Sequence, residues 1–407
     1  MRSVPEWWTD AIRTSHQVRT RVMAYRGGGV GQVEVPITEG TVTFDATAEE
    51  ERRCQFTVPR FDETGFDWQP GRDRLHPLAP YGQSVYISNG MFNPAVSGQF
   101  HVCHMGHYLI TNVESDSQTV QVTGADFWRK LKEQNIQGSP IDGFGPSHTY
   151  QSALFRLTWV GLQNTFTDDV QIIAPDFSAM SSNPRLSQYV ATPFMSDRTE
   201  PIKTLADAWG ARVYVNDVAD LAFVPKVLEP SSTPVFTFRG GVNGSLLRRV
   251  RTQDRDGVYN WIIAQGKDPS TGANTYYGRL FTESGALDIR GPHGWVSQYF
   301  ETGQFATVDD AIRTVNDLWA ASMLRGFTET ITAVPNPALQ LYDTVRVIGD
   351  DGTPNDMIVL ALDIPLTASS NGGEMRVVVG ERVDSTSAAA IKKAGIGNAY
   401  TGSDSQR

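Results

Sequence analysis

Histidine and cysteine side chains gather in one short stretch of the sequence, at His101, Cys103, His104 and His107. These side chain types are common zinc ligands. On an extended strand His101 and Cys103 would lie on one face, while His104 would point to the other. The chain also lacks a second ligand pair at zinc spacing, such as a later C-x-x-C. We therefore interpret these residues as strand-packing or surface side chains and predict no metal site.

Three other segments could suggest ligand binding, and each has a simpler interpretation. The acidic turn at residues 350–356 lacks the bidentate glutamate that completes an EF-hand, so a plain hairpin turn is expected. The glycine-rich residues 27–31 join two predicted strands, and no helix N-terminus is available there to bind phosphate. The basic run at residues 248–251 is expected to line a solvated strand edge.

Sequence motifs of the common enzyme classes are absent. The chain contains no phosphate loop G-x-x-x-x-G-K-[ST], no zinc-protease helix H-E-x-x-H and no nucleophile elbow G-x-S-x-G. Among 45 acidic residues, no spacing selects a pair for glycoside hydrolysis. We therefore predict no catalytic, cofactor-binding or metal-binding residues, no cofactor, and a protein that is not an enzyme.

Nine tryptophans raise the question of sugar binding by ring stacking. On the apolar faces of predicted helices, where core packing is the usual role, lie Trp128, Trp159, Trp209 and Trp319. A freer sequence context surrounds Trp7, Trp8, Trp68 and Trp295. For these, packing or a subunit interface is the first interpretation, and ligand stacking is the second.

Composition excludes several classes of protein. At 407 residues, 40% of them hydrophobic, the chain can bury sizeable cores in two to four domains. A formal net charge of −10 is opposite to that of most nucleic-acid binders, so sequence-specific nucleic-acid binding is not expected. No apolar run approaches the ~18–20 residues of a membrane span, and no signal-peptide segment opens the chain. We expect cytoplasmic synthesis, no stable membrane insertion, and reduced thiols at Cys54 and Cys103.

The first 135 residues have the pattern of a small antiparallel barrel or sandwich. A short helix is predicted at 7–17 and another at 125–134, with a polar loop at 61–78. Period-two alternation rich in β-branched and aromatic residues predicts the strands. They are residues 18–26, 32–37, 41–45, 53–58, 84–88, 98–103, 107–115 and 118–124.

Residues 136–234 have a mixed α+β pattern. A Gly/Pro-rich linker at 138–148 precedes a predicted helix at 149–162, and 168–193 is rich in loops. A stronger helix at 200–210 begins near Pro201 and ends at Gly210. A hairpin with strands at 212–216 and 221–225 follows it.

The β pattern returns from residue 235. Predicted strands lie at 235–239, 246–252, 260–265, 276–280, 328–333, 344–348, 357–362 and 374–379. An amphipathic helix at 308–325 presents Val315, Leu318 and Trp319 as a core-facing stripe. Residues 384–407, rich in Ser, Ala and Gly, are predicted to form a flexible C-terminal tail. The predicted fold is α+β and mostly β: two related antiparallel β-barrel domains, 1–135 and 235–383, with an intervening α+β domain, 136–234.

The order of these segments resembles that of bacteriophage tail proteins. Three features resemble minor tail proteins of long-tailed phages infecting actinobacteria. They are residues 15–22 after a short helix, the spacing of Ile37, Gly40, Val42 and Asp45, and the segment 78–82 that leads into a strand. The helix and hairpin at 202–225 and the segment 336–345 resemble the baseplate-hub family shared with type VI secretion spikes. In that family a Gly-Asp pair stands where this chain has Tyr342-Asp343.

The resemblance implies a structural hub of the virion tail tip, or baseplate. Such a hub is a homotrimer whose barrels form a ring that joins the six-fold tail tube to the three-fold tip. It implies contacts with the distal tail protein ring, the tape-measure protein and the tip or receptor-binding proteins. The genome would transit the channel, and an acidic subunit suits that role because like charge reduces adhesion. The alternative is a tail-borne receptor- or cell-wall glycan-binding protein, and a tail-borne hydrolase comes third.

Overall fold

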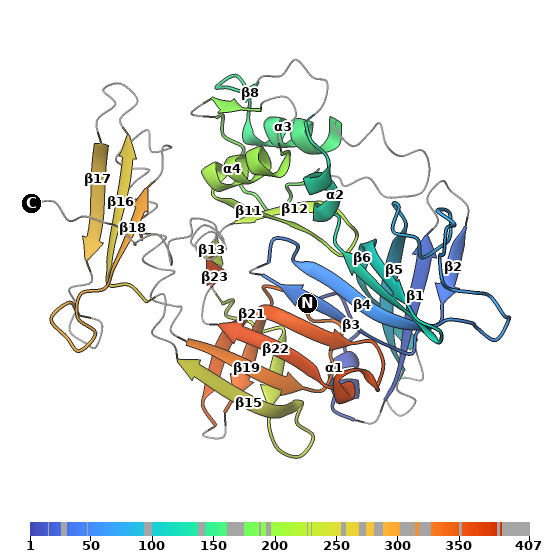
Figure 1. Ribbon diagram of the computed structural model, residues 1–407. Helices are drawn as coiled ribbons and strands as arrows, with labels where there is room; N and C mark the ends of the chain where they lie inside the picture. Colours follow the sequence, from blue (N-terminus) through green and yellow to red (C-terminus); the bar gives the residue numbers. More distant parts are fainter. Residues whose placement is uncertain are drawn as a thin grey trace, which may run out of the picture.

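The computed structural model describes residues 1–14, 16–25, 31–46, 48–92, 100–136, 143–160, 175–186, 189–192, 197–225, 227–228, 230–253, 258–267, 274–280, 288–301, 312, 315–316, 327–349, 352–380 and 383–384. Figure 1 shows two β-rich regions side by side, a region with helices above them, and a small sheet apart from both. The fold is mostly β with an α+β part, as the sequence predicts.

The first β region consists of antiparallel strands in the spatial order β3-β4-β7-β6-β5-β1-β2. Their bounds are β1 (Gln17–Tyr25), β2 (Gln32–Val35), β3 (Glu39–Asp45), β4 (Arg52–Pro59), β5 (Ser84–Phe92), β6 (Phe100–Ser115) and β7 (Thr119–Ala125). Most of the predicted strands are confirmed. The helix α1 (Trp8–Ile12) is shorter than predicted, because the chain is already extended at Gln17, which pairs with Phe92.

Strand β6 corrects a prediction, because the sequence divides it into two strands at 98–103 and 107–115. The strand is continuous over Phe100–Ser115 and carries an irregularity opposite Ile87 and Ser88 of β5. Gly106 sits there with a φ of +141°, a conformation that side chains with a Cβ rarely adopt. A Cβ on Gly106 would also lie 2.7 Å from the Tyr108 hydroxyl oxygen. Glycine therefore continues this strand where the sequence pattern suggests a break.

The second β region has the spatial order β15-β19-β22-β21-β20-β14. Its strands are β14 (Phe236–Arg239), β15 (Leu246–Gln253), β19 (Phe327–Ala333), β20 (Thr344–Ile348), β21 (Pro354–Pro365) and β22 (Met375–Gly380), and a short 3-10 helix, η2 (Ser370–Gly373), precedes β22. Strand β21 also pairs with β3, so that both regions belong to one 13-stranded sheet. One continuous hydrophobic core runs through both regions.

The α+β region has a separate hydrophobic core. Its helices are α2 (Trp128–Glu133), α3 (Tyr150–Phe155) and α4 (Thr199–Trp209), with a π-helical turn η1 (Arg156–Val160) after α3. Its short strands are β8 (Gly143–Phe144), β9 (Pro175–Asp176), β10 (Val190–Ala191), β11 (Ala211–Val215) and β12 (Leu221–Pro225). The predicted helix that ends at Gly210 and the following hairpin are confirmed. Helix α2 is shorter than predicted, whereas α3 and the π-helical turn after it together cover residues 150–160 of the helix predicted at 149–162.

Strands β16 (Trp261–Lys267), β17 (Asn274–Leu280) and β18 (Ser297–Glu301) form a sheet of their own between β15 and β19 in the sequence. The predicted helix at 308–325 lies outside the described residues except at Ile312, Val315 and Asn316, which are helical, with Val315 buried. Strand β23 (Val383–Asp384) pairs with β13 (Val227–Leu228), so Asp384, placed in the tail by the sequence, is part of a strand. The rest of the tail lies outside the described residues, in which no helix is long and apolar enough to cross a membrane.

Candidate assembly site

The two β regions repeat one strand arrangement, and this repeat is the main functional feature of the fold. In spatial order, β3-β4-β7-β6-β5 of the first region correspond to β15-β19-β22-β21-β20 of the second. All of these neighbours are antiparallel in both regions. The far ends of the two regions differ, because β1 pairs antiparallel with β5 and with β2, whereas β14 pairs directly with β20 in parallel. The sequence shows only a coarse echo between these regions.

The repeat extends to the register of individual residues. The β6–β7 pairing shifts between Ile110 and Asn112, opposite Gly124 and Thr123. The β21–β22 pairing shifts in the same way between Val359 and Ala361, opposite Val379 and Val378. Each long strand thus has one extra residue at the same place. The pair Ser84 and Leu109 accordingly matches the pair Thr344 and Ile358.

The chain enters β5 and β20 through the same turn. The backbone N–H of Leu78 donates to the His76 Nδ1 atom over 3.1 Å, and that of Ala338 donates to the Asn336 Oδ1 atom over 3.1 Å. A hydrogen bond from the neighbouring strand to the end of each turn also matches: in the first region the Ile110 N–H of β6 donates to the Gln83 carbonyl over 3.0 Å. Its counterpart is Val359 N–H, which donates to the Asp343 carbonyl over 3.0 Å. The segments 78–82 and 336–345, which the sequence presents as separate family motifs, are therefore one motif used twice.

The same turn holds a backbone conformation that favours glycine. Gly82 has a φ of +101° in the first region, and Tyr342 has a φ of +71° at the matching position of the second. A tyrosine is strained in this conformation. Its ring lies under the Arg212 guanidinium, 3.4 Å from ring centroid to Cζ. This contact places the Tyr342 side chain against the α+β region and gives a physical reason for tyrosine in place of the resembled family's glycine.

A buried charged junction centred on Asp217 connects the three regions. Asp217, in the β11–β12 turn, accepts two hydrogen bonds from Arg2, at 2.8 and 2.9 Å, and one from Arg52. The Gln340 amide donates to the same carboxylate over 2.5 Å. The Arg2 guanidinium also donates to the carbonyls of Pro337 and Leu339, each over 2.8 Å. One carboxylate thus binds the N-terminal segment, strand β4 and the turn before β20.

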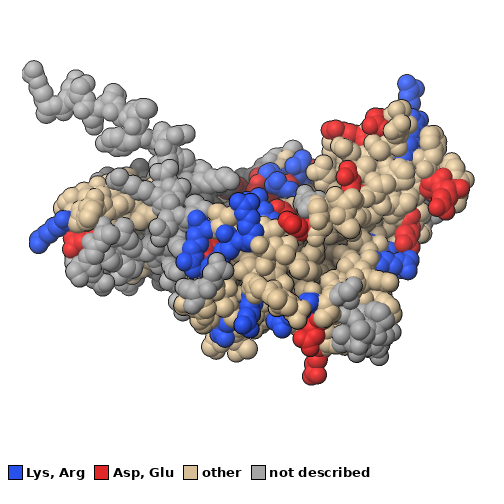
Figure 2. Space-filling view, turned by 90° about the horizontal axis from the view of Figure 1, so that it is seen from below, with Lys and Arg blue, Asp and Glu red and all other residues tan. Residues whose placement is uncertain are grey.

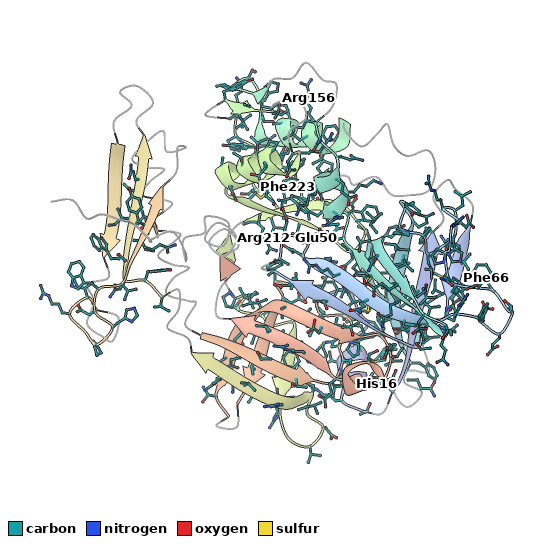
Figure 3. The ribbon with its side chains drawn as sticks, in the orientation of Figure 1. His16, Glu50, Phe66, Arg156, Arg212 and Phe223 are labelled. Carbon is teal, nitrogen blue, oxygen red and sulfur yellow. The ribbon has the colours of Figure 1, made fainter. Side chains whose placement is uncertain are left out.

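Burial dominates the electrostatics of this junction. The side chains of Arg2 and Arg52 are 8% and 4% exposed, and burial lowers the pKa of both. Arg212 pairs with Glu51, and burial lowers the pKa of Arg212 while it raises that of Glu51. Figure 3 labels Arg212 and Glu50 where the α+β region meets the first β region. Loss of one partner from a buried ion pair lowers the free energy of unfolding strongly, so these contacts favour a single relative orientation of the regions.

A neighbouring ion-pair group joins the first β region to the α+β region at the surface. Glu49 binds Lys132 of α2 at 2.5 Å and also Lys203 of α4. Partial burial acts to raise the pKa of Glu49, but the two lysines lower it to about 2. The carboxylate therefore stays charged across the physiological pH range. Together with the junction around Asp217, this group connects the β regions and the α+β region through ionic contacts.

The two β regions meet where β21 extends past β20 and pairs with β3. Ala361 to Pro365 run antiparallel to Thr41 to Asp45. The inward side chains at this joint, Val42, Phe44, Leu362 and Ile364, are fully buried. On the outer face the Thr43 hydroxyl donates to the Asp363 carboxylate over 2.9 Å. This joint is the intramolecular contact between the two copies of the repeat.

The His and Cys side chains that lie close together in the sequence, at residues 101–107, do not converge on one point in the structure. Cys103 and His107 are buried, and the His107 ring contacts the Ser84 hydroxyl at 2.8 Å. The His101 ring packs edge-on against Trp8, while His104 packs against Tyr86. Among the described residues, no group of three or more His, Cys, Asp or Glu side chains could hold a metal ion.

Most of the described tryptophans pack in the core, which is the first interpretation of the sequence. Trp128 and Trp209 are buried, as predicted, while the side chains of Trp159 and Trp319 lie outside the described residues. Trp8 and Trp68 are fully buried and not free for a partner. The Trp8 indole N–H donates to the Asn336 Oδ1 atom over 3.0 Å, a long-range contact that leaves no local sequence signal. Trp295 is 61% exposed and packs edge-on against Trp261.

Comparison with known proteins gives structural matches only: no family model and no curated protein matches the sequence. The tail protein from Neisseria meningitidis MC58 has a TM-score of 0.62 at 15% identity, covering 91% of this chain and 99% of that one. The 43 kDa tail protein of prophage MuSo2 from Shewanella oneidensis has a TM-score of 0.62 at 12% identity, covering 90% and 99%. Prophage tail protein gp18 from Listeria monocytogenes EGD-e has a TM-score of 0.52 at 11% identity, covering 92% and 99%. This chain therefore has the fold of these phage tail proteins over nearly its whole length.

Proposed function

We propose that the protein is a structural component of a bacteriophage tail and, more specifically, the hub of the tail tip. In this role it is a virion protein, made in the bacterial cytoplasm and not an enzyme. The sequence resemblance extends the proposal to tails of phages that infect actinobacteria. The hub joins the six-fold tail tube and distal tail ring to the three-fold tip and surrounds the genome passage.

The repeated strand arrangement is the observation that carries this proposal. A joint between a six-fold ring and a three-fold tip needs a subunit that presents the same surface twice. Two β regions with one strand order and matching bulges supply two such surfaces in one chain. Three chains in a closed ring would then present six β regions. The buried junction around Asp217 supports the same role, because the two surfaces must keep a fixed geometry.

The proposed partners follow from this position. They are two further copies of the chain, the distal tail protein ring, the tape-measure protein and the tip or receptor-binding proteins. The domain boundaries 1–135, 136–234, 235–383 and 384–407 stay part of the proposal. The formal charge of −10 suits a passage through which the genome moves without adhering.

Receptor or glycan binding is the second candidate, and the exposed Trp295, packed against the partly buried Trp261, is the observation that favours it. The two rings meet at an interplanar angle of 84° and not as a flat platform, which weakens this candidate because sugars stack on a ring face.

The test is genetic and compositional. Deletion of the gene from its phage should give particles without a complete tail tip, restored by the intact gene in trans. Quantitative mass spectrometry of purified virions should find about half as many copies of this protein as of a distal tail ring protein. Normal tails that fail only to adsorb to host cells would favour receptor binding instead.

A further inference from the structure

We propose that the free edge of β6 beyond Ile110 pairs with strand β15 of a second copy of this chain. This pairing would reproduce between two molecules the joint that β21 and β3 form within one. The inference rests on the proposed ring of subunits and adds to it the contact that closes the ring. The partner is thus another copy of the same chain, bound edge to edge.

The repeat itself identifies the two edges. Strand β21 leaves β20 after Ile358 and then pairs with β3 along residues 361–365. The matching bulges align Ala361 with Asn112, so residues 361–365 correspond to 112–116 at the end of β6. In the first region Cys54 of β4 pairs with Val42 of β3 on one side and with Gly124 of β7 on the other. In the second region Glu329 of β19 pairs in the same way with Arg251 of β15 and Val379 of β22. Since Gly124 and Val379 are aligned, Val42 of β3 corresponds to Arg251 of β15.

Both edges are available in the part of the chain that the structure describes. There, Asn112 to Ser115 of β6 pair with β7 alone, and β15 pairs with β19 alone. Asn112, Glu114 and Ser115 are exposed. On β15, Leu247 and Val250 are 55% and 39% exposed. An unpaired strand edge with exposed apolar side chains is a template for pairing with another chain.

The alignment fixes the register of the proposed pairing. Asp363 lies opposite Thr43 in the intramolecular joint, so Glu114 of one copy would lie opposite Thr252 of the next. In the intramolecular joint the Thr43 hydroxyl donates to Asp363 over 2.9 Å, and the residue types at the aligned positions, Thr252 and Glu114, are again a threonine and an acid. In the same way Ser115 takes the position of Ile364 and lies opposite Arg251.

Charge supports this orientation and predicts a weak contact. The β6 end carries Glu114 and Asp116, while β15 carries Arg248, Arg249 and Arg251. Arg249 and Arg251 share one buried carboxylate, Glu329, so this edge keeps a net positive charge. Figure 2 shows Lys and Arg side chains gathered over the side of the molecule where β15 lies in Figure 1. The intramolecular joint buries Val42 and Ile364, whereas the matching intermolecular positions are Arg251 and Ser115. The pairing should therefore be held by strand hydrogen bonds and charge, and it should weaken with added salt.

The test is a disulfide designed across the proposed pair in the full-length protein. The variant carries Glu114→Cys and Thr252→Cys, and the natural thiols of Cys54 and Cys103 are buried. Oxidation of a concentrated solution at low salt should give a covalent product that ends at three chains, and less of it at high salt. A matched control replaces exposed Glu34 on β2 in place of Glu114, together with Thr252→Cys, and should remain monomeric.

Four outcomes are distinguishable. A covalent trimer only from the designed pair supports the proposal. A monomer after oxidation, or equal cross-linking of the control, overturns the pairing, and so does an open ladder of four or more chains. The tail-tip role would survive such a result if virions still contained the protein at the tip, so the two proposals fail separately.

Discussion

Replacement of Asp217 by asparagine should destabilise the protein strongly, although the side chain keeps its shape. The Asp217 carboxylate is the shared anion for Arg2 and Arg52, whose side chains are 8% and 4% exposed. The Asp217→Asn variant leaves both guanidinium groups buried without this counter-charge. Removal of one partner from a buried ion pair typically costs about 3–5 kcal/mol of unfolding free energy. The Gln340 amide can still donate to the remaining oxygen, so the loss should come from charge and not from a cavity.

Urea denaturation followed by tryptophan fluorescence measures this loss. The control is Glu34→Gln, which removes an ion pair with Arg21 whose side chains are 46% and 55% exposed. Pairs this exposed contribute less than about 1 kcal/mol, so the control should unfold at nearly the wild-type midpoint. An Asp217→Asn midpoint equal to that of the control would refute the view that this junction fixes the three regions together.

Three further comparisons of variants test separate features. Tyr342→Gly should be more stable than Tyr342→Ala by about 1 kcal/mol in urea denaturation. Both variants lose the Arg212 contact, but only alanine keeps the backbone strain at a φ of +71°. Equal stability of the two variants would contradict the argument from backbone strain. Burial raises the pKa of Asp126 to about 7, so folding favours the neutral acid. The contribution of this group to the free energy of unfolding is fully present below about pH 4 and is lost as the pH rises to 7. Between pH 5 and 8 the wild type should therefore lose on the order of 3 kcal/mol relative to Asp126→Asn, and the comparison cancels the effect of His107, whose pKa burial lowers to about 4; parallel pH profiles would contradict this. Gly106→Ala should lower the free energy of unfolding by about 2–3 kcal/mol and Gly82→Ala by about 1 kcal/mol. Both glycines have a positive φ, but only at Gly106 does Tyr108 occupy the space of a Cβ. The reverse order in thermal denaturation would show that the bulge is not constrained as described.

Local patterning predicted most strands of the sheet. The alternation in residues 41–45 and 53–58 is strong because one face of each strand is buried in a continuous core. It failed at residues 104–106 for a local reason, since the bulge at Gly106 changes the alternation without ending β6. The sequence signal for a short break and for a bulge is the same glycine.

Contacts between distant segments could not be predicted from patterning. The β21–β3 joint pairs residues about three hundred positions apart, and neither strand marks its partner. The Arg2–Asp217 contact is equally remote, and both residues occur in segments that sequence alone treats as ordinary termini and turns. The internal repeat escaped notice because it is a repeat of register and turn geometry. At matching positions such as Gly82 and Tyr342, the side chains have little in common.

A cryo-electron microscopy map of the virion tail tip is the measurement that tests the hub assignment most directly. The account predicts three copies of this chain around the tail axis, with both β regions of each copy contacting the ring above at equivalent positions. It also predicts that β6 of each copy is next to β15 of its neighbour. Six copies around the axis, or a peripheral position in which only one β region contacts the ring, would contradict the assignment.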